Sequence, residues 1–331
     1  MSNLKRLSVQ KIFLSSNGYN SPYVEPLPND ASFRRYYRLY TDEGSVLLMD
    51  APPDKENIVS FIKISKHLQS IGLRTPNIIA SDVDQGLMII EDFGDNTFTK
   101  LLNAGSDPGP LFEDAIDVLI HIHNHNSSAI IDIPSYNIKT LIEEAVLLVD
   151  WHWPEVFGEK CSVAIRDAYI HAWQEVFMAL PKPDNTLVLR DYHIGNLMQL
   201  QTGEGVTRLG LLDFQDAVIG PKAYDVVSLI EDARRDNSAL SEELLSRYFR
   251  GVGFVERASF KRWFSALGAH RHAKCIGIFV RLYRRDGKRI YLQYIPHVIN
   301  MFEKHLQSRD LKPVFNWFQQ YYRNFINHHF S

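Results

Sequence analysis

The order of local patterns along the chain limits the fold more than any other feature of the sequence. Up to Glu91 the chain alternates between short β-rich runs and one amphipathic helical segment. From Thr97 onward apolar residues recur at helical spacing, except between Thr186 and Phe214, where short apolar strands return. The sequence therefore predicts an α+β fold, with a small twisted sheet and its helix first and a mainly helical part after it.

The sheet-forming part contains four recognisable strands, and we expect the complete sheet to have five. The runs 33–40 and 45–50 are separated by Thr-Asp-Glu-Gly, which is a hairpin signal. A helix is predicted over residues 56–71, where apolar side chains recur at helical spacing. Two further strands are predicted over residues 78–81 and 87–91.

A turn at Gly94-Asp95-Asn96 marks the predicted boundary between two lobes. We expect an N-terminal lobe over residues 1–92 and a C-terminal lobe over residues 93–331. In the second lobe apolar stripes predict helices over residues 111–125, 140–151, 163–180 and 262–284, with another beginning near Ala223.

Length and composition exclude several classes of protein. A chain of 331 residues is about right for two packed lobes. Its formal charge of −3 argues against a nucleic-acid partner, which would call for a basic face. Cys161 and Cys275 do not make a disulfide framework or a zinc site, and so favour a reducing compartment. Because no run is apolar enough for a signal peptide or a membrane span, we expect a soluble cytoplasmic protein.

Carboxylates stand at the ends of two short strands between Thr186 and Phe214. Asp191 follows the first strand, Asn196 lies five residues later, and Asp213 ends a second apolar run. Mg²⁺ takes oxygen ligands and is usually held by one or two carboxylates together with substrate phosphates. Phosphoryl transfer needs such a metal ion and a carboxylate that orients the attacking hydroxyl. The layout therefore predicts a Mg²⁺ site suited to phosphoryl transfer.

Each of these residues also has an ordinary structural interpretation. A single Asp at a strand end is more often a turn or cap residue than a catalyst, and only the combination in this order favours chemistry. His193 is a candidate metal ligand or acid–base group, or else a residue that orders its loop by hydrogen bonding. Gln215 and Asp216 either face the substrate or hold the loop.

The same residues resemble a known superfamily. The run D-x-H-x-x-N from Asp191 to Asn196, followed by a hydrophobic strand that ends in Asp213-Phe214, is similar to the signature of aminoglycoside phosphotransferase-like kinases, distant relatives of protein kinases. The segment G-P-x-A-Y-D-x-x-S-L at 220–229 strengthens the resemblance. It implies a protein-kinase-like two-lobed fold, with Asp191 as catalytic base, Asn196 and Asp213 as Mg²⁺ ligands, and Asp225 as the residue that stabilises the catalytic loop.

The resemblance also implies an ATP site in the N-terminal lobe. The strand that contains Glu91, with Phe93 just after it, resembles the strand and hinge whose backbone pairs with adenine. Residues 30–38 take the place of the phosphate-covering loop, in which Ser32, Arg34 and Arg35 are candidate ATP ligands.

Two departures from protein kinases concern the phosphates of ATP. The loop 30–38 contains no glycine, and the strand 46–50 has no lysine where a phosphate-binding lysine would stand. Arginine binds phosphates through paired hydrogen bonds, so Arg34, Arg35 or Arg38 could supply the charge. Otherwise ATP is held weakly, or the chain does not catalyse.

An ordered series of segments narrows the resemblance. D-A-S-F-R-R-Y-Y-R-L, M-D-A-P-P, I-I-E-D-F-G-D, L-V-D-W-H-W-P and R-D-G-K-R-x-Y-L follow one another between Asp30 and Leu292. Together they are similar to the anomeric sugar kinases that phosphorylate N-acetylmuramate and N-acetylglucosamine in bacterial cell-wall recycling, which share the lysine-less M-D-A-P-P strand. The resemblance implies a sugar whose C1 hydroxyl hydrogen-bonds to Asp191.

Two sets of side chains are candidates for binding the sugar. Trp151 and Trp153 could stack on its ring, although packing in the core explains them as well. Arg234, Arg281 and Arg285 could bind a lactyl carboxylate, with ordinary surface charge as the alternative.

Two other functions fit the same motifs. One is a kinase for another hydroxylated metabolite, such as an aminoglycoside, choline or homoserine. The other is a pseudokinase that binds nucleotide without turnover. The basic segment 262–285 argues against a polycationic aminoglycoside, and the retained Asp191, Asn196 and Asp213 argue against a pseudokinase. We expect a monomer.

Overall fold

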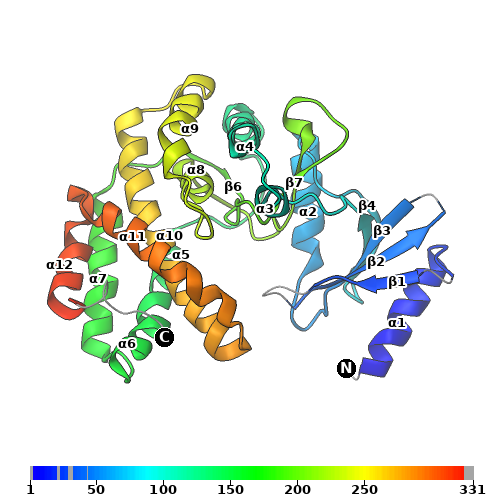
Figure 1. Cartoon of the computed structure of the whole chain (residues 1–331), viewed down its shortest axis with the longest axis horizontal. Coiled ribbons are helices and arrows are strands. Elements are labelled where there is room, and N and C mark those ends of the chain that lie inside the picture. Colours follow the sequence, from blue (N-terminus) through cyan, green and yellow to red (C-terminus); the bar gives the residue numbers. More distant parts are fainter. Residues whose placement is uncertain (1–2, 21–22, 29–32, 43, 324–331) are drawn as a thin grey trace. The chain divides into compact units, whose positions relative to one another are not determined.

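The structure is a computed structural model that describes residues 3–20, 23–28, 33–42 and 44–323. The chain divides into two compact units (Figure 1). Unit 1 comprises Met1–Asp114 and Gly195–Asp216, and unit 2 comprises Ala115–Ile194 and Ala217–Ser331. The predicted lobe boundary near residue 92 is a different partition of the chain and stays a prediction.

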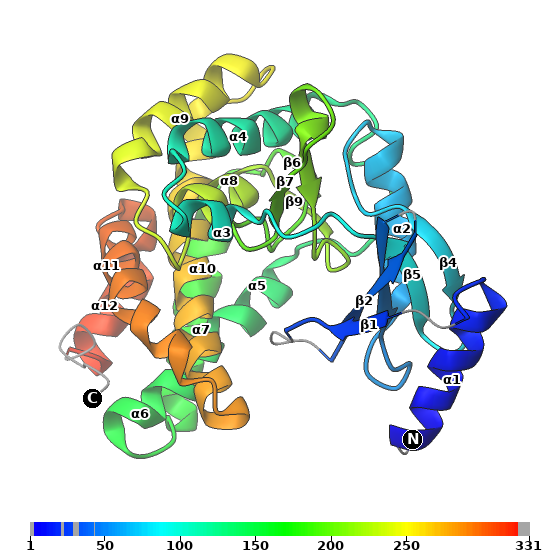
Figure 2. The ribbon, with the colours of Figure 1, turned by 45° about the vertical axis from the view of Figure 1, so that its right-hand side comes forward.

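Unit 1 is built on a five-stranded antiparallel sheet, as predicted (Figure 2). The strand order is β1-β2-β3-β5-β4, and every neighbouring pair is antiparallel. The strands are β1 Tyr23–Pro26, β2 Arg35–Thr41, β3 Gly44–Asp50, β4 Ile78–Asp82 and β5 Leu87–Glu91. The expected hairpin joins β2 to β3, with Tyr40 opposite Ser45.

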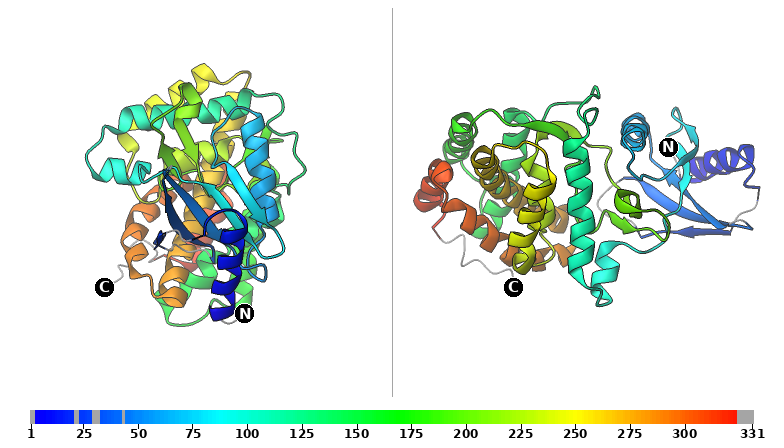
Figure 3. Two further views of the ribbon diagram at one scale, coloured as in Figure 1. Left: turned by 90° about the vertical axis from the view of Figure 1, so that its right-hand side faces the viewer. Right: turned by 90° about the horizontal axis from the view of Figure 1, so that it is seen from above.

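Helix α1 Asn3–Ser16 packs on one face of this sheet (Figure 3, left panel). Its Phe13 and Leu14 are buried against strand side chains that include Leu48 and Ile89. No pattern predicted this helix, because its exposed face is not cleanly polar: Leu7 and Ile12 remain exposed.

A buried carboxylate attaches α1 to the sheet. Asp50, at the end of β3, is 2% exposed and accepts hydrogen bonds from Arg6 and from Gln10 Nε2, the latter at 2.5 Å. Asp50 belongs to the strand that lacks the expected lysine. Its pairing with α1 shows that this position serves the fold of unit 1.

Helix α2 Ile58–Ser70 is the predicted helix of the first part. It begins where the Asn57 side chain accepts from the Val59 N–H, and the chain turns after it at Gly72, where φ is +84°. Its buried face includes Phe61 and Leu68. Strand side chains that alternate away from α1 are buried as well, so both faces of the sheet are covered.

A small hairpin and two helix segments complete unit 1. Strands β7 Leu197–Gln199 and β8 Leu209–Leu211 pair antiparallel, and the 3₁₀ helix η2 Gly205–Arg208 lies between them. Single bridges join Gly210 to Arg74 and Met198 to Thr97. The helices are α3 Phe98–Asn103 and α4 Pro108–Asn124, the second of which continues into unit 2.

Unit 2 is mostly helical and is organised around α10 Arg257–Asp286, the long yellow-to-orange helix of Figure 1. Helices α5, α8 and α11 and the segments η1 and η3 pack against it. The remaining elements are α5 Ile138–Ala145, η1 Leu148–His152, α6 Trp153–Phe157, α7 Val163–Ala179, β6 Asn185–Val188, β9 Val218–Pro221, α8 Ala223–Ile230, α9 Ser238–Gly251, η3 Arg289–Tyr294, α11 Ile295–Leu306, η4 Arg309–Leu311 and α12 Lys312–Tyr321. Within the described ranges, no helix is long and apolar enough to cross a membrane.

One predicted helix is wrong in its second half. The helix expected over residues 140–151 ends at Ala145, and Leu148–His152 forms a π-helix instead. The physical reason lies in α10, where a Cβ on Gly277 would stand 2.2 Å from the Leu147 carbonyl carbon. Helix α10 thus approaches the backbone of this segment directly, and the chain widens into a π turn there.

Candidate active site

The loop that carries Asp191 is fixed at its start by a buried carboxylate. Asp225, on α8, is 1% exposed and accepts hydrogen bonds from the Leu189 N–H at 2.6 Å and the Arg190 N–H at 3.0 Å. Burial raises the pKa of Asp225 to about 7, although the two hydrogen bonds act to lower that pKa. These contacts confirm that Asp225 stabilises the loop, as the resemblance implies.

The same loop is fixed after Asp191 as well. Tyr192 donates its hydroxyl to the Ala115 carbonyl at 2.8 Å, and its own carbonyl accepts from Ser228 Oγ at 3.0 Å. The Ile194 N–H donates to the fully buried carboxylate of Asp232 at 3.2 Å. Asp191 itself is partly exposed. Because the backbone on both sides of it is hydrogen-bonded, its position on unit 2 can vary little.

A charged network holds the residue before Asp191. Arg190 has φ of +70°, a conformation that side chains rarely adopt. Its guanidinium pairs with Glu144, which also accepts from Lys274 Nζ at 3.0 Å and from the Tyr136 hydroxyl. Burial alone would raise the pKa of Glu144, but the charges of Lys274, His270 and Arg190 outweigh it and lower that pKa to about 2. Glu144 is therefore a carboxylate at neutral pH.

His193 lies beside a cation. Arg234 Nη1 is 3.4 Å from the His193 ring nitrogens, and the Arg234 N–H donates to Asp232 at 2.8 Å. Burial, followed by the charge of Arg234, lowers the pKa of His193 to about 3. The imidazole is neutral at pH 7, which favours the loop-ordering interpretation over acid–base chemistry.

In unit 1 the β7–β8 hairpin brings Asn196 and Asp213, the two candidate Mg²⁺ ligands, to the same end of the paired strands. Leu197 pairs with Leu211, so Asn196, which precedes β7, stands opposite the residues that follow β8. The Leu212 N–H donates to the Asn196 carbonyl at 3.0 Å, one residue before Asp213. Antiparallel register is therefore what places Asn196 and Asp213 together.

Asp213 is held in an unusual backbone conformation, with φ of +55°. The next residue, Phe214, is 1% exposed, and its ring centroid lies 4.8 Å from that of Phe61 on α2. Gln215 Nε2 donates to Asp213 Oδ1 at 3.0 Å and to the exposed Asp216 at 3.1 Å. Asp216 thus contacts Gln215, the same side chain that contacts Asp213 in unit 1.

These donors fit Mg²⁺, which prefers oxygen ligands. The set contains the amide of Asn196, the carboxylate of Asp213 and the neighbouring Gln215 side chain. Gln215 Oε1 is buried and has no hydrogen-bond partner among the described residues, so an additional oxygen acceptor lies next to Asp213.

Of the three arginines considered for phosphate binding, Arg34 is the one beside Asp213. Arg34 Nη2 donates to Asp213 Oδ1 at 2.8 Å, Arg34 Nε is 3.7 Å from Glu56 Oε2, and the residue is 8% exposed. Arg38 is committed to Asp92, with contacts of 2.6 and 3.1 Å at the end of β5.

The other candidate ATP residues have less defined surroundings. Arg35 is exposed at the start of β2, and Ser32 lies outside the described residues. Glu91 ends β5 and pairs with Arg74 through two contacts of 3.0 and 2.5 Å. The Phe93 ring packs against Gly210, where a Cβ would stand 2.7 Å from it.

The candidate sugar-binding residues divide by burial. Trp153 is 6% exposed and packs on Phe157 and Tyr322, with ring centroids 4.2 and 5.1 Å away, so packing in the core explains it and stacking on a sugar does not. Trp151 is half-buried and stays a candidate. Arg281 is half-buried too, and its buried Nε has no hydrogen-bond partner among the described residues, whereas Arg285 pairs with Asp286.

The structure also reveals positioning residues that sequence reasoning missed. Asp232 holds the Asp191 loop and Glu144 holds its neighbour Arg190, while Lys274 donates to Glu144. Each stands in an ordinary amphipathic helix or just after one. The only available signal was a charged residue next to an otherwise apolar stripe, which is too common to single them out.

Comparison with solved structures identifies the class of fold. A choline/ethanolamine kinase family protein from Mesorhizobium loti superposes with a TM-score of 0.63, covering 95% of this chain and 99% of its own, at 13% identity. Together with the five-stranded sheet and the helical remainder, this likeness confirms the predicted α+β, protein-kinase-like fold class. The profile described as Phosphotransferase enzyme family matches residues 24–263, and the chain belongs to that family.

Curated relatives carry a more specific name. A protein from Caulobacter vibrioides named N-acetylmuramate/N-acetylglucosamine kinase is 30% identical over 96% of this chain and 97% of its own length. A protein of the same name from Pseudomonas putida is 37% identical over 81% of this chain and 79% of its own length. The predicted family resemblance is confirmed.

Proposed function

We propose that this chain is an ATP- and Mg²⁺-dependent kinase that phosphorylates the anomeric hydroxyl of an N-acetylated amino sugar, either N-acetylmuramate, N-acetylglucosamine or both. One observation carries the proposal: relatives named N-acetylmuramate/N-acetylglucosamine kinase match this chain at 30% and 37% identity over most of its length. The product, a sugar 1-phosphate, would enter cell-wall recycling.

Asp191 would be the general base that orients the attacking hydroxyl and accepts its proton. This role needs a carboxylate whose position does not vary, because positioning supplies much of the rate enhancement in phosphoryl transfer. The bonds from Leu189, Arg190 and Ile194 to buried carboxylates support it, since they leave the loop few alternative conformations.

Asn196 and Asp213 would hold Mg²⁺, which neutralises charge on the transferring phosphoryl group when it is bound. Arg34 would take the place of the missing lysine. In protein kinases that lysine is held by a glutamate, and here Glu56 stands beside Arg34 in the same way. Because a guanidinium donates paired hydrogen bonds, Arg34 suits a phosphate oxygen pair.

Adenine would pair with the backbone after β5. The Glu91 N–H already donates to the Asn77 carbonyl at 2.9 Å. We therefore assign the Glu91 carbonyl and the Phe93 N–H to the base. The Arg74 ion pair would hold the Glu91 side chain aside.

The test is acceptor-dependent ADP release with ATP and Mg²⁺ over a panel of N-acetylmuramate, N-acetylglucosamine, free hexoses, aminoglycosides and choline. We expect turnover with at least one N-acetylated sugar and a 1-phosphate product by NMR. The Asp191→Asn variant should lose about 10²–10⁴-fold in kcat, the usual contribution of a general base, and still bind ATP.

Three results would contradict parts of the proposal. Turnover with an aminoglycoside or choline alone would replace the substrate. ATP binding without turnover on any acceptor would favour a pseudokinase. Undiminished turnover in Asp191→Asn would remove Asp191 from the chemistry and leave the kinase assignment intact.

A further inference from the structure

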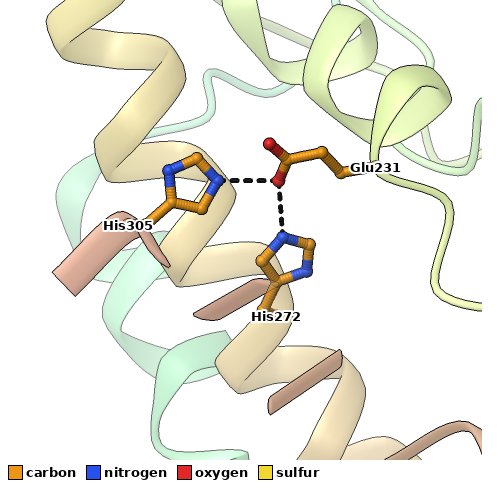
Figure 4. A group of neighbouring side chains, drawn as sticks. All are labelled: Glu231, His272 and His305. Atoms are coloured by element: carbon orange, nitrogen blue, oxygen red, sulfur yellow. Dashed lines mark hydrogen bonds and ion pairs between the residues drawn. The ribbon is translucent and has the colours of Figure 1, made fainter. Parts of the chain in front are cut away.

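We propose that Glu231, His272 and His305 form a binding site for a divalent transition-metal cation, with Zn²⁺ as the best-suited ion (Figure 4). The three residues come from different elements of unit 2. Glu231 directly follows α8, His272 lies in the middle of α10, and His305 lies in the last turn of α11. Neither the family match nor the kinase proposal uses them.

The side chains converge on one point. His272 Nε2 and His305 Nε2 each lie 2.7 Å from the same oxygen, Glu231 Oε2, and the ligand atoms are all within 4.8 Å of one another. Figure 4 shows both imidazoles directed at that carboxylate. Zinc bonds of about 2.0–2.1 Å to nitrogen and oxygen in tetrahedral geometry would separate these atoms by roughly 3.3 Å. A shift of well under ~1 Å in each contact would therefore accommodate the ion.

Packing holds the two imidazoles in this arrangement. The His272 side chain is fully buried, and His305 and Glu231 side chains are only 11% and 20% exposed. The two rings stack, with centroids 5.6 Å apart and an interplanar angle of 25°. A Cβ on Gly268 would stand 2.2 Å from His305 Nε2, so the present position of the His305 ring depends on the absence of a side chain there. The cluster is thus built into the helix packing.

The charge states are those that a metal requires. Burial lowers the pKa of His272 to about 4, so its imidazole is neutral at pH 7. Burial alone would raise the pKa of Glu231, but before an ion binds, hydrogen bonds from His272 and His305 outweigh it and lower that pKa, so the cluster already holds an ionised carboxylate. The positive charge of Arg271 would repel a cation here, since its Nη1 is 3.5 Å from the Glu231 carbonyl oxygen. The negative charge of buried Asp232 offsets part of that repulsion.

A polar cavity reaches Glu231, the carboxylate of the cluster. It has a volume of about 140 Å³, and its lining includes Glu231, Asp236, Asn237 and Lys304. Asn237 is 4% exposed, and neither polar atom of its side chain has a hydrogen-bond partner among the described residues. Three protein ligands would leave the fourth zinc position for water.

The competing arrangement is a hydrogen-bonded triad without metal. Both imidazoles would then carry a proton on Nε2 and donate it to Glu231, which would tie α10, α11 and the end of α8 together. The two arrangements differ in one measurable property, because only the metal site loses its Nε2 protons to bind an ion.

The experiment uses full-length, tag-free protein that has been stripped with a chelator and then titrated with Zn²⁺ or Co²⁺ at pH 7.5. Elemental analysis should give one tightly bound Zn²⁺ per chain, and Co²⁺ should produce the visible absorption of a tetrahedral nitrogen–oxygen site. Zn²⁺ should also raise the Tm. In His305→Gln the affinity should fall at least about tenfold, the lower end of the loss seen when even an outer-shell partner is removed.

Controls separate this site from adventitious binding. A second pair of histidines, His121 on α4 and His125 just after it, has ring centroids 5.7 Å apart. The double variant His121→Gln/His125→Gln removes this pair and should bind Zn²⁺ as the wild type does. Glu231→Gln keeps the shape of the cluster, serves if His305→Gln fails to fold, and should also lose affinity. Absence of the Co²⁺ absorption in the wild type would overturn the proposal, as would equal Zn²⁺ affinity in the wild type and both cluster variants.

Discussion

At the scale of single residues, backbone strain coincides with the candidate chemistry. In the described part of the chain, Arg190 and Asp213 are the only residues other than glycine with positive φ. Such conformations cost about 1–3 kcal/mol each and persist only where surrounding contacts impose them. Here Asp225 imposes the first, by accepting from Arg190, and the buried Phe214 imposes the second. This coincidence supports assigning function to both loops.

Replacing Asp225 tests whether loop geometry controls the rate. In Asp225→Asn the amide nitrogen would face one of the two N–H donors, which leaves a buried donor unsatisfied at a cost of about 1–3 kcal/mol. We expect kcat to fall while the KM for ATP stays within about twofold, because no ATP contact is removed. Steady-state kinetics checks this, and a change confined to KM would contradict it.

Replacing Arg34 tests its proposed phosphate contact. Arg34→Gln keeps hydrogen-bonding capacity but removes the charge, so kcat/KM for ATP should fall about tenfold or more, the effect of losing roughly 1.5–3 kcal/mol from a charged hydrogen bond. Arg35→Gln, at an exposed neighbour, is the matched control and should change little. Equal losses in both variants would assign the effect to general charge.

At the scale of elements, close backbone approach at Gly277 shapes unit 2. Helix α10 meets the chain between α5 and η1 at this glycine, and the expected helix changes into a π turn there. The two nearest atoms are the backbone carbonyl carbon and oxygen of Leu147, so no side-chain rotation could make room for a methyl group on residue 277. Glu144, which holds Arg190, lies three residues earlier on α5.

We expect Gly277→Ala to destabilise unit 2 by about 1–3 kcal/mol or more, the usual effect of overpacking a core. A shift of α5 should also disturb Glu144, so kcat should fall in the folded fraction. Lys261→Ala, at an exposed position of the same helix, is the control and should stay within about ±0.5 kcal/mol. Thermal unfolding compares the two variants; a neutral or stabilised Gly277→Ala would contradict the close contact.

At the scale of the whole molecule, three buried histidines and the half-buried His193 dominate the expected pH response. Burial is the largest cause of the low pKa in each case, about 3 for His123 and His193 and about 4 for His270 and His272. In the unfolded chain these imidazoles would titrate near 6.5. The unfolded state therefore binds more protons between about pH 6.5 and 4, and stability is lost as the pH falls through that window.

Thermal unfolding at pH 7.5, 6.5 and 5.5 checks this. Each histidine contributes up to about 1.4 kcal/mol per pH unit below its unfolded pKa, so Tm should fall on acidification. Asp225 works in the opposite direction, because burial raises its pKa to about 7 and its protonation favours the folded state. On acidification four histidines thus lower the stability of the fold and one carboxylate raises it, so we expect a net loss. A constant or rising Tm down to pH 5.5 would show that these histidines are not neutral in the folded protein.

Much of the fold and of the candidate site was predictable because the relevant information is local. Strands, most helices and the spacing of Asp191, Asn196 and Asp213 are properties of short segments, in which periodicity and motif can be read directly. Helix α1 and the π turn at Leu148–His152 were not predictable, because a buried carboxylate at Asp50 and a distant glycine on α10 determine them.

The sequence by itself determined the kinase-like fold class, the family and the motif residues, since each depends on the order and spacing of nearby residues. Only the tertiary structure decided that Arg34, among three arginines, lies beside Asp213, that Trp153 belongs to the core, and that Glu231, His272 and His305 meet at one point. The physical reason is the same in each case. Residues far apart in the chain acquire their partners, burial and charge state only when packing brings their helices and strands together.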